Sequence, residues 1–174
     1  MNTKYFNVPQ ARERMIFIGV RNDLNIKPSH PAIDILKSFT VYDAIHDLPR
    51  NKQVPEIDHI WIDESPTGRN TKTWHIAHKC KEGQKYGQQQ MRSYWMKPFA
   101  TIMKLQLHIK TGNCHPSETR AFSTRELARG ASFPDQFRFF DGKGNERIGN
   151  SVPPFFMFAI AKHIRNNILL SPLI

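Results

Sequence analysis

The hydrophobic pattern of the 174-residue chain has an unbroken apolar run at Met15 to Val20 and a longer apolar stretch after Ser151. The run is too short for a buried helix and is typical of a strand covered on both faces in a parallel sheet. The stretch opens with two prolines, which suit the first turn of a helix, and continues with apolar residues on nearly every side. We therefore predict a buried strand and a buried C-terminal helix with Ser151 as its N-cap.

Two shorter helices are predicted between these elements. Each begins with a capping box, in which a hydroxyl residue is followed three residues later by a carboxylate. Gly130 lies late in the second helix and is expected to weaken it by ~1 kcal/mol relative to alanine. The boxes are Thr40 with Asp43 and Ser123 with Glu126, and the helices are expected over residues 40–48 and 123–132.

From residue 50 to residue 110 the periodicity gives way to polar sequence, with 11 Lys or Arg against 5 Asp or Glu. Basic side chains interleaved with aromatic ones are typical of a nucleic-acid surface. They also suit a loop-rich β subdomain whose aromatic residues form a small core. Composition leaves both interpretations open for the aromatic residues Trp61, Trp74, Tyr86, Tyr94 and Trp95.

The net charge of +10 predicts an anionic partner, with nucleic acid the first candidate. The chain has two cysteines in no paired spacing, and no signal segment opens it, which argues against disulfides and secretion. No apolar run approaches the roughly 20 residues that a membrane helix needs. We expect a cytoplasmic protein that does not enter a membrane.

Four of the histidines and cysteines could bind zinc if the fold brought them together. Their spacing matches no standard zinc pattern, and histidines in a basic, polar segment are more often exposed or directed at DNA. We therefore expect no metal. The residues concerned are His75, His78, Cys80, Cys114 and His115.

Near the N-terminus, Gln10, Arg12 and Arg14 alternate, so their side chains share one face of an extended segment. A guanidinium can bind a phosphate or a base carbonyl oxygen bidentately and keeps its charge in a partly dry site. Recognition of an extruded nucleotide needs such a group. Alternating arginines at a strand edge are also common on solvated surfaces, so this string by itself does not distinguish a nucleotide-binding site from a solvated surface.

Three strings together resemble the last conserved blocks of the DNA cytosine-5 methyltransferases: PQARER at 9–14, RAFSTRELARGASFPD at 120–135 and IGNSVPP at 148–154. The resemblance implies an α/β fold. It would comprise the C-terminal part of a Rossmann-like, S-adenosylmethionine-dependent methyltransferase domain and a small, irregular, β-rich target-recognition region. Residues 1–49 would belong to the catalytic domain, 50–119 to the target-recognition region, and 120–174 to an organising helix and a returning helix.

The resemblance also implies roles for the alternating residues. Arg14 would hold the flipped cytosine through its carbonyl oxygen and stabilise developing charge, while Arg12 and Gln10 would support that site. The family's glycine-rich cofactor loop and Pro-Cys nucleophile loop have no match in the chain. Neither Cys80 nor Cys114 lies in a Pro-Cys sequence, so neither is expected to be the nucleophile.

Two further sites follow from the same resemblance. Asn150, Ser151 and Val152 would form this chain's part of the S-adenosylmethionine pocket. Thr101, in the string KPFATI, would contact the DNA backbone. His115 is expected to be structural.

The resulting functional hypothesis is a C-terminal portion or subunit of a DNA (cytosine-5) methyltransferase of a restriction-modification system. It would methylate cytosine C5 in a specific sequence of double-stranded DNA, using S-adenosylmethionine and no metal. Alone it would be inactive, and it would need an N-terminal methyltransferase subunit or would self-associate. The alternative is an inactive fragment or a non-catalytic DNA-binding module.

Overall fold

The computed structural model describes residues 1–33, 38–49, 92–104, 115–118 and 120–170. Most of the predicted target-recognition region, residues 50–119, lies outside these ranges. Two isolated β-bridges join described residues, Asn2 with Glu13 and Gln10 with Phe99. The helical elements are η1 (Thr3–Tyr5), η2 (Asn22–Leu24), α1 (Val41–Ile45), α4 (Thr124–Gly130), α5 (Gly144–Asn150), α6 (Pro154–Ile164) and the π-helical turn η3 (Arg165–Leu169).

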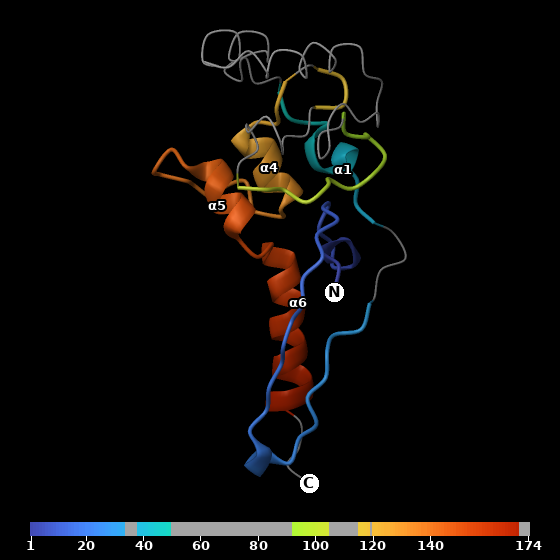
Figure 1. Ribbon diagram of the computed structural model, residues 1–174, viewed down its shortest axis with the longest axis vertical. Helices are drawn as coiled ribbons and strands as arrows, with labels where there is room; N and C mark the ends of the chain where they lie inside the picture. Colours follow the sequence, from blue (N-terminus) through green and yellow to red (C-terminus); the bar gives the residue numbers. More distant parts are fainter. Residues whose placement is uncertain (34–37, 50–91, 105–114, 119, 171–174) are drawn as a thin grey trace, which may run out of the picture.

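Helices α1, α4 and α5 gather at one end of the structure, and α6 projects away from them (Figure 1). The extended segment that follows residue 14 runs beside α6 toward η2. Two apolar clusters correspond to this division. One lies among α1, α4 and α5, and the other joins α6 to the N-terminal residues Phe6 and Val8. No helix in the described ranges has the length and apolar character needed to cross a membrane.

Both predicted capping boxes are confirmed. The Thr40 hydroxyl accepts a hydrogen bond from the Asp43 amide at 3.2 Å, and the Asp43 carboxylate accepts one from the Thr40 amide at 2.8 Å. Ser123 and Glu126 exchange the same pair of bonds at 3.2 and 2.6 Å. Because a capping box satisfies free amides at the first turn, it determines where each helix begins.

Glycines allow close packing at two helix ends. A side-chain carbon on Gly130, the last residue of α4, would lie 3.0 Å from the buried ring of Phe99. One on Gly149, in α5, would lie 2.2 Å from the backbone nitrogen of Lys104. The expected cost of Gly130 to the helix is therefore accompanied by a close approach to Phe99, which a larger residue could keep only if the ring shifted.

The predicted strand at residues 15–20 is not formed among the described residues. The segment is extended, with Ile16 and Ile18 against the α6 cluster, while Met15 and Phe17 are 81% and 86% exposed. It belongs to neither isolated bridge. The prediction of a strand covered on both faces is wrong for this structure, because no described segment supplies a neighbouring strand.

The prediction for the C-terminal helix is only partly confirmed. Pro154 occupies the first turn, but the N-cap is Pro153, whereas Ser151 is the C-cap of α5 and donates a hydrogen bond to Ile148 O at 2.7 Å. Burial on nearly all sides is wrong as well, since only Phe156 and Ile160 of α6 are buried. Helix α5 itself was not predicted, because it has glycines near both ends and a single apolar residue, Ile148.

We expect Gly149→Ala to lower the free energy of unfolding by about 1–3 kcal/mol, the usual cost of overpacking. The added methyl group would meet the rigid backbone of Lys104, which cannot rotate away. Gly19→Ala is the matched control, because nothing lies within 4 Å of the added carbon. Chemical denaturation of both variants measures the difference, and equal stabilities would contradict the close approach seen at Gly149.

Candidate functional site

The buried guanidinium of Arg12 joins two parts of the chain that are far apart in sequence. Its Nη1 donates to Ile102 O and its Nη2 donates to Gly149 O, each at 2.9 Å. Burial lowers the pKa of Arg12 from its usual value, and the charge of Arg14 lowers it further. A guanidinium nevertheless stays protonated in proteins. We call this arrangement the Arg12 clamp, meaning Arg12 with its acceptors Ile102 O and Gly149 O.

Gln10 and Thr101 reinforce the same junction. The buried Gln10 side chain accepts a hydrogen bond from Ile102 N at 3.1 Å, and Thr101 Oγ1 donates to Ala11 O at 3.1 Å. Main-chain bonds from Ala11 N to Phe99 O and from Phe99 N to Pro9 O, both 2.8 Å, complete the pairing. Three residues predicted for the site, Gln10, Arg12 and Thr101, are thus brought together.

Arg14 differs from Gln10 and Arg12 in its environment. Its side chain is exposed, and Nη1 donates to the carbonyl oxygen of the adjacent Glu13 at 2.6 Å. The face shared by the alternating residues therefore passes from the interior at Arg12 to the surface at Arg14. An exposed guanidinium next to a buried, anchored one has the freedom to meet an incoming ligand.

The residues predicted to contact the cofactor lie directly after the acceptor Gly149. Asn150 is the exposed last residue of α5, Ser151 is half-buried, and Val152 is exposed before α6. This turn offers a side-chain amide and an apolar side chain at the surface, whereas the Ser151 hydroxyl is already bonded to Ile148 O. Such a mixed surface fits the edge of a ligand with both polar and apolar parts.

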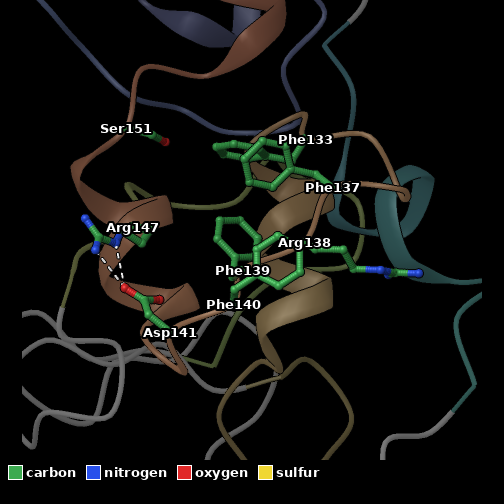
Figure 2. A pocket seen from close by; sticks show the side chains of 8 residues that line it. All are labelled: Phe133, Phe137, Arg138, Phe139, Phe140, Asp141, Arg147 and Ser151. Atoms are coloured by element: carbon green, nitrogen blue, oxygen red, sulfur yellow. Dashed lines mark hydrogen bonds and ion pairs between the residues drawn. The ribbon is translucent and has the colours of Figure 1, made fainter.

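A cavity of about 400 Å³ opens beside this turn (Figure 2). Four phenylalanines line it, together with Arg138, Ser151 and the ion pair of Arg147 with Asp141 at 2.7 Å. Three of the rings pack on one another with centroids 4.9 to 5.5 Å apart, while that of Phe140 is 94% exposed. The cavity was not predicted from sequence, where the closely spaced phenylalanines of FPDQFRFF were the feature that could have indicated it. Its rings are Phe133, Phe137, Phe139 and Phe140.

A buried network of charges holds the first turn of α4. Arg120 donates through Nη1 and Nη2 to the Glu126 carboxylate at 2.9 and 2.8 Å, and through Nε to Glu118 at 2.9 Å. Glu126 is buried and also belongs to the capping box, and Arg120 lowers its pKa against the effect of burial. These contacts give Glu126 a structural role.

His115 lies in the same network. Its Nδ1 accepts from the amides of Ser117 and Glu118 at 3.3 and 3.2 Å. Burial, followed by the charge of Arg120, lowers the pKa of His115 to about 4. The four other residues weighed as metal ligands lie outside the described ranges. Within those ranges no group of three or more His, Cys, Asp or Glu side chains could hold a metal ion.

Comparison with known proteins identifies the family. The C-5 cytosine-specific DNA methylase family matches residues 1–166. The chain belongs to this family. The family that the three strings indicated is thereby confirmed.

Several type II methyltransferases are similar to this C-5 methylase chain. M.PspPI of Psychrobacter is 33% identical over 182 residues, which cover 92% of this chain and 43% of that protein. M.Sau96I of Staphylococcus aureus is 31% identical, with 88% of this chain and 39% of the relative covered. M.Eco47II of Escherichia coli is 31% identical, with 92% and 43% covered. The chain thus spans about two fifths of the length of these relatives.

A solved structure shows the shared fold. It is a protein encoded within an E. coli prophage and described as a DNA modification methyltransferase, and it matches with a TM-score of 0.71 and 21% identity. The match covers 97% of this C-5 methylase chain and 59% of that chain. The roles predicted for individual site residues stay predictions.

We expect Arg12→Lys to lower the free energy of unfolding by about 1–3 kcal/mol, because it leaves a buried carbonyl unsatisfied. An ammonium cannot reproduce the planar fork that reaches Ile102 O and Gly149 O together. Arg14→Lys, the same change at an exposed position, is expected to stay within about 0.5 kcal/mol. Urea denaturation of the two variants measures the difference, and equal losses would contradict the clamp.

We also expect the free energy of unfolding to decrease as the pH decreases, because His115 becomes protonated. Its folded pKa lies below the unfolded value of 6.5, so the stability present above pH 6.5 is lost progressively as pH falls toward about 4. The groups facing the ring are Arg120, Glu126, Glu118 and Arg92. His115→Asn retains an acceptor for the two amides and should flatten the profile between pH 6.5 and 4. Denaturation at each pH measures the free energy of unfolding. If it decreases with pH as steeply in the variant as in the parent, other groups cause the loss.

Proposed function

We propose that the chain forms the C-terminal portion of a DNA (cytosine-5) methyltransferase of a restriction-modification system. The observation that supports this most directly is the Arg12 clamp. One of its acceptors, Ile102 O, is adjacent to Thr101, and the other, Gly149 O, is adjacent to Asn150. A single buried side chain therefore joins the predicted DNA contact to the predicted cofactor turn, with Arg14 two residues away.

In the proposed reaction, a cysteine thiolate adds to cytosine C6, C5 takes the methyl group, and loss of the C5 proton releases the thiolate. S-adenosylmethionine supplies the methyl group. The exposed amide of Asn150 and the apolar side chain of Val152 fit one edge of that cofactor, and Ser151 shapes the turn between them. The nucleophile would come from the portion of the relatives that this chain does not span.

Arg14 is the residue of this chain that we place at the reacting base. Its exposed guanidinium would donate hydrogen bonds to the cytosine carbonyl oxygen and stabilise the negative charge that develops there during thiolate attack. Arg12 and Gln10 act through position, because their bonds to Ile102 anchor the segment that carries Arg14. Thr101 would contact the DNA backbone beside it.

The proposed partners are double-stranded DNA and the N-terminal portion of the methyltransferase. The net charge of +10 suits a polyanion. A non-catalytic DNA-binding module or an inactive fragment is the second candidate. The net charge of +10 suits DNA binding without catalysis equally well.

The test is transfer of tritiated methyl groups from S-adenosylmethionine to DNA. We expect no transfer by the chain alone and transfer when it is co-expressed with the portion of M.PspPI that it does not match. Arg14→Ala should lower kcat by about 10²–10³-fold in that mixture, as loss of an oxyanion donor does. Arg125→Ala, at another exposed arginine, should not. Salt-sensitive DNA binding without methyl transfer would favour the second candidate.

A further inference from the structure

Ser132 has a backbone conformation that is unusual for a residue with a side chain. Its φ is 61°, in the left-handed region, and it directly follows Ala131, the C-cap of α4. Ser132 N donates to Arg129 O at 2.9 Å, and Phe133 N donates to Ala128 O at 2.8 Å. These two bonds form a Schellman motif, whose left-handed position is usually occupied by glycine. Serine at this position carries a conformational cost that glycine would avoid.

The hydroxyl group of Ser132 makes a contact that glycine could not make. Ser132 is buried, and its Oγ accepts a hydrogen bond from Phe155 N at 3.1 Å. Helix α6 has no side-chain cap of its own, because its N-cap is Pro153. Pro153 and Pro154 have no N–H, so Phe155 N is the first amide of the helix that needs an acceptor. Ser132 therefore supplies the cap of α6 from the end of α4.

This cap fixes one end of the turn between α5 and α6. The other end is fixed by Arg12 Nη2, which donates to Gly149 O at 2.9 Å. Between the two attachments lie residues 150–152, the proposed cofactor turn, and the two prolines. Since both ends of this short segment are bonded to other parts of the chain, few conformations remain open to it.

The residue after Ser132 faces the same turn. Phe133 lines the aromatic cavity together with Ser151, and Figure 2 shows the two side chains at the same end of it. Ser132 is not part of the described lining of this cavity. We therefore expect Ser132 to affect a ligand beside Ser151 through the position of the turn.

We propose that Ser132 is a positioning residue for S-adenosylmethionine. Its hydroxyl holds the start of α6, so that Asn150 and Val152 keep the geometry that binds the cofactor. The inference rests on the proposed function and adds a residue to its cofactor site. Backbone strain is commonly found where the surrounding structure serves a functional site, and a left-handed serine beside the cofactor turn has this character.

Two substitutions separate the hydroxyl from the backbone strain. Ser132→Gly removes both, whereas Ser132→Ala removes the hydroxyl and keeps a Cβ in the left-handed region. We expect Ser132→Ala to be the less stable variant in urea denaturation. A positioning role predicts that both variants bind the cofactor more weakly to the same extent, because both lack the acceptor for Phe155 N. A role in stability alone predicts that Ser132→Gly binds it as the parent does.

Hydrogen exchange in the full chain alone tests the cap directly. The Phe155 amide should exchange about tenfold faster in both Ser132 variants than in the parent, because its hydrogen bond is lost. The amide NMR shifts of Asn150, Ser151 and Val152 should change as well. Unchanged exchange and unchanged shifts in both variants would overturn the claim that Ser132 holds the turn.

Methyl transfer by the chain co-expressed with the portion of M.PspPI that it does not match tests the effect on the cofactor. We expect both Ser132 variants to raise KM for S-adenosylmethionine by about three- to tenfold and to leave kcat within about twofold of the parent, because lost ground-state binding raises KM alone. Thr40→Gly is the matched control, since it removes a hydroxyl acceptor of the same kind, for Asp43 N at 3.2 Å, from the cap of α1. It should leave KM at the parent value.

The outcomes separate this inference from the proposed function. The C-terminal part of M.PspPI serves as the positive control for its other portion. If that control is active and the parent mixture is not, the proposed function is contradicted and the cofactor role of Ser132 with it. If the parent mixture is active and KM is unchanged in Ser132→Gly, or rises equally in Thr40→Gly, the role of Ser132 is overturned and the proposed function is left intact.

Discussion

The described structure depends on the buried guanidinium of Arg12. Removing a charge from water is costly, and the cost is met only where hydrogen bonds replace the lost hydration. Two carbonyl oxygens, Ile102 O and Gly149 O, do so at 2.9 Å, yet Nε of Arg12 is buried and has no hydrogen-bond partner among the described residues. An arginine at this place is therefore a costly way to obtain stability alone. Its acceptors lie next to Thr101, the predicted DNA contact, and Asn150, the predicted cofactor residue, which fits the function that we propose.

The segment that carries Arg12 also joins the two apolar clusters. Val8 is fully buried in the cluster with Phe156 and Ile160 of α6. Two residues later Gln10 bonds to Ile102, which belongs to the cluster among α1, α4 and α5. A short extended stretch thus fixes the position of α6 relative to the other helices. The position of the exposed Arg14 is set by these two attachments of the segment, at Val8 and at Gln10.

An element of the fold could be predicted from sequence when the interactions that form it join residues close together in the chain. The starts of α1 and α4 were predictable, because a capping box such as Ser123 with Glu126 spans only three residues. Helix α5 was missed because its glycines serve packing against a distant segment, as the contact of Gly149 with Lys104 shows.

Side-chain environments in the candidate site needed the tertiary structure. Alternation placed Arg12 and Arg14 on one face, but it could not show that the first is buried and bonded and the second exposed. The family resemblance was carried by the motifs themselves and was confirmed over residues 1–166. The aromatic cavity beside Ser151 depends on how Phe133, Phe137 and Phe139 fold back on one another, which no local pattern specifies.

The two ends of the structure differ in how completely their charged groups are paired and their apolar groups are buried among the described residues. Around α4 the buried charges of Arg120 and Glu126 are paired and hydrogen-bonded within the chain, so adding a partner there would gain little. Along α6, apolar rings such as Phe158 remain exposed, so the described residues bury less apolar surface at this end. Arg12 lies at the boundary, where its bonds to Ile102 O and Gly149 O attach the N-terminal segment to the end that holds α1, α4 and α5.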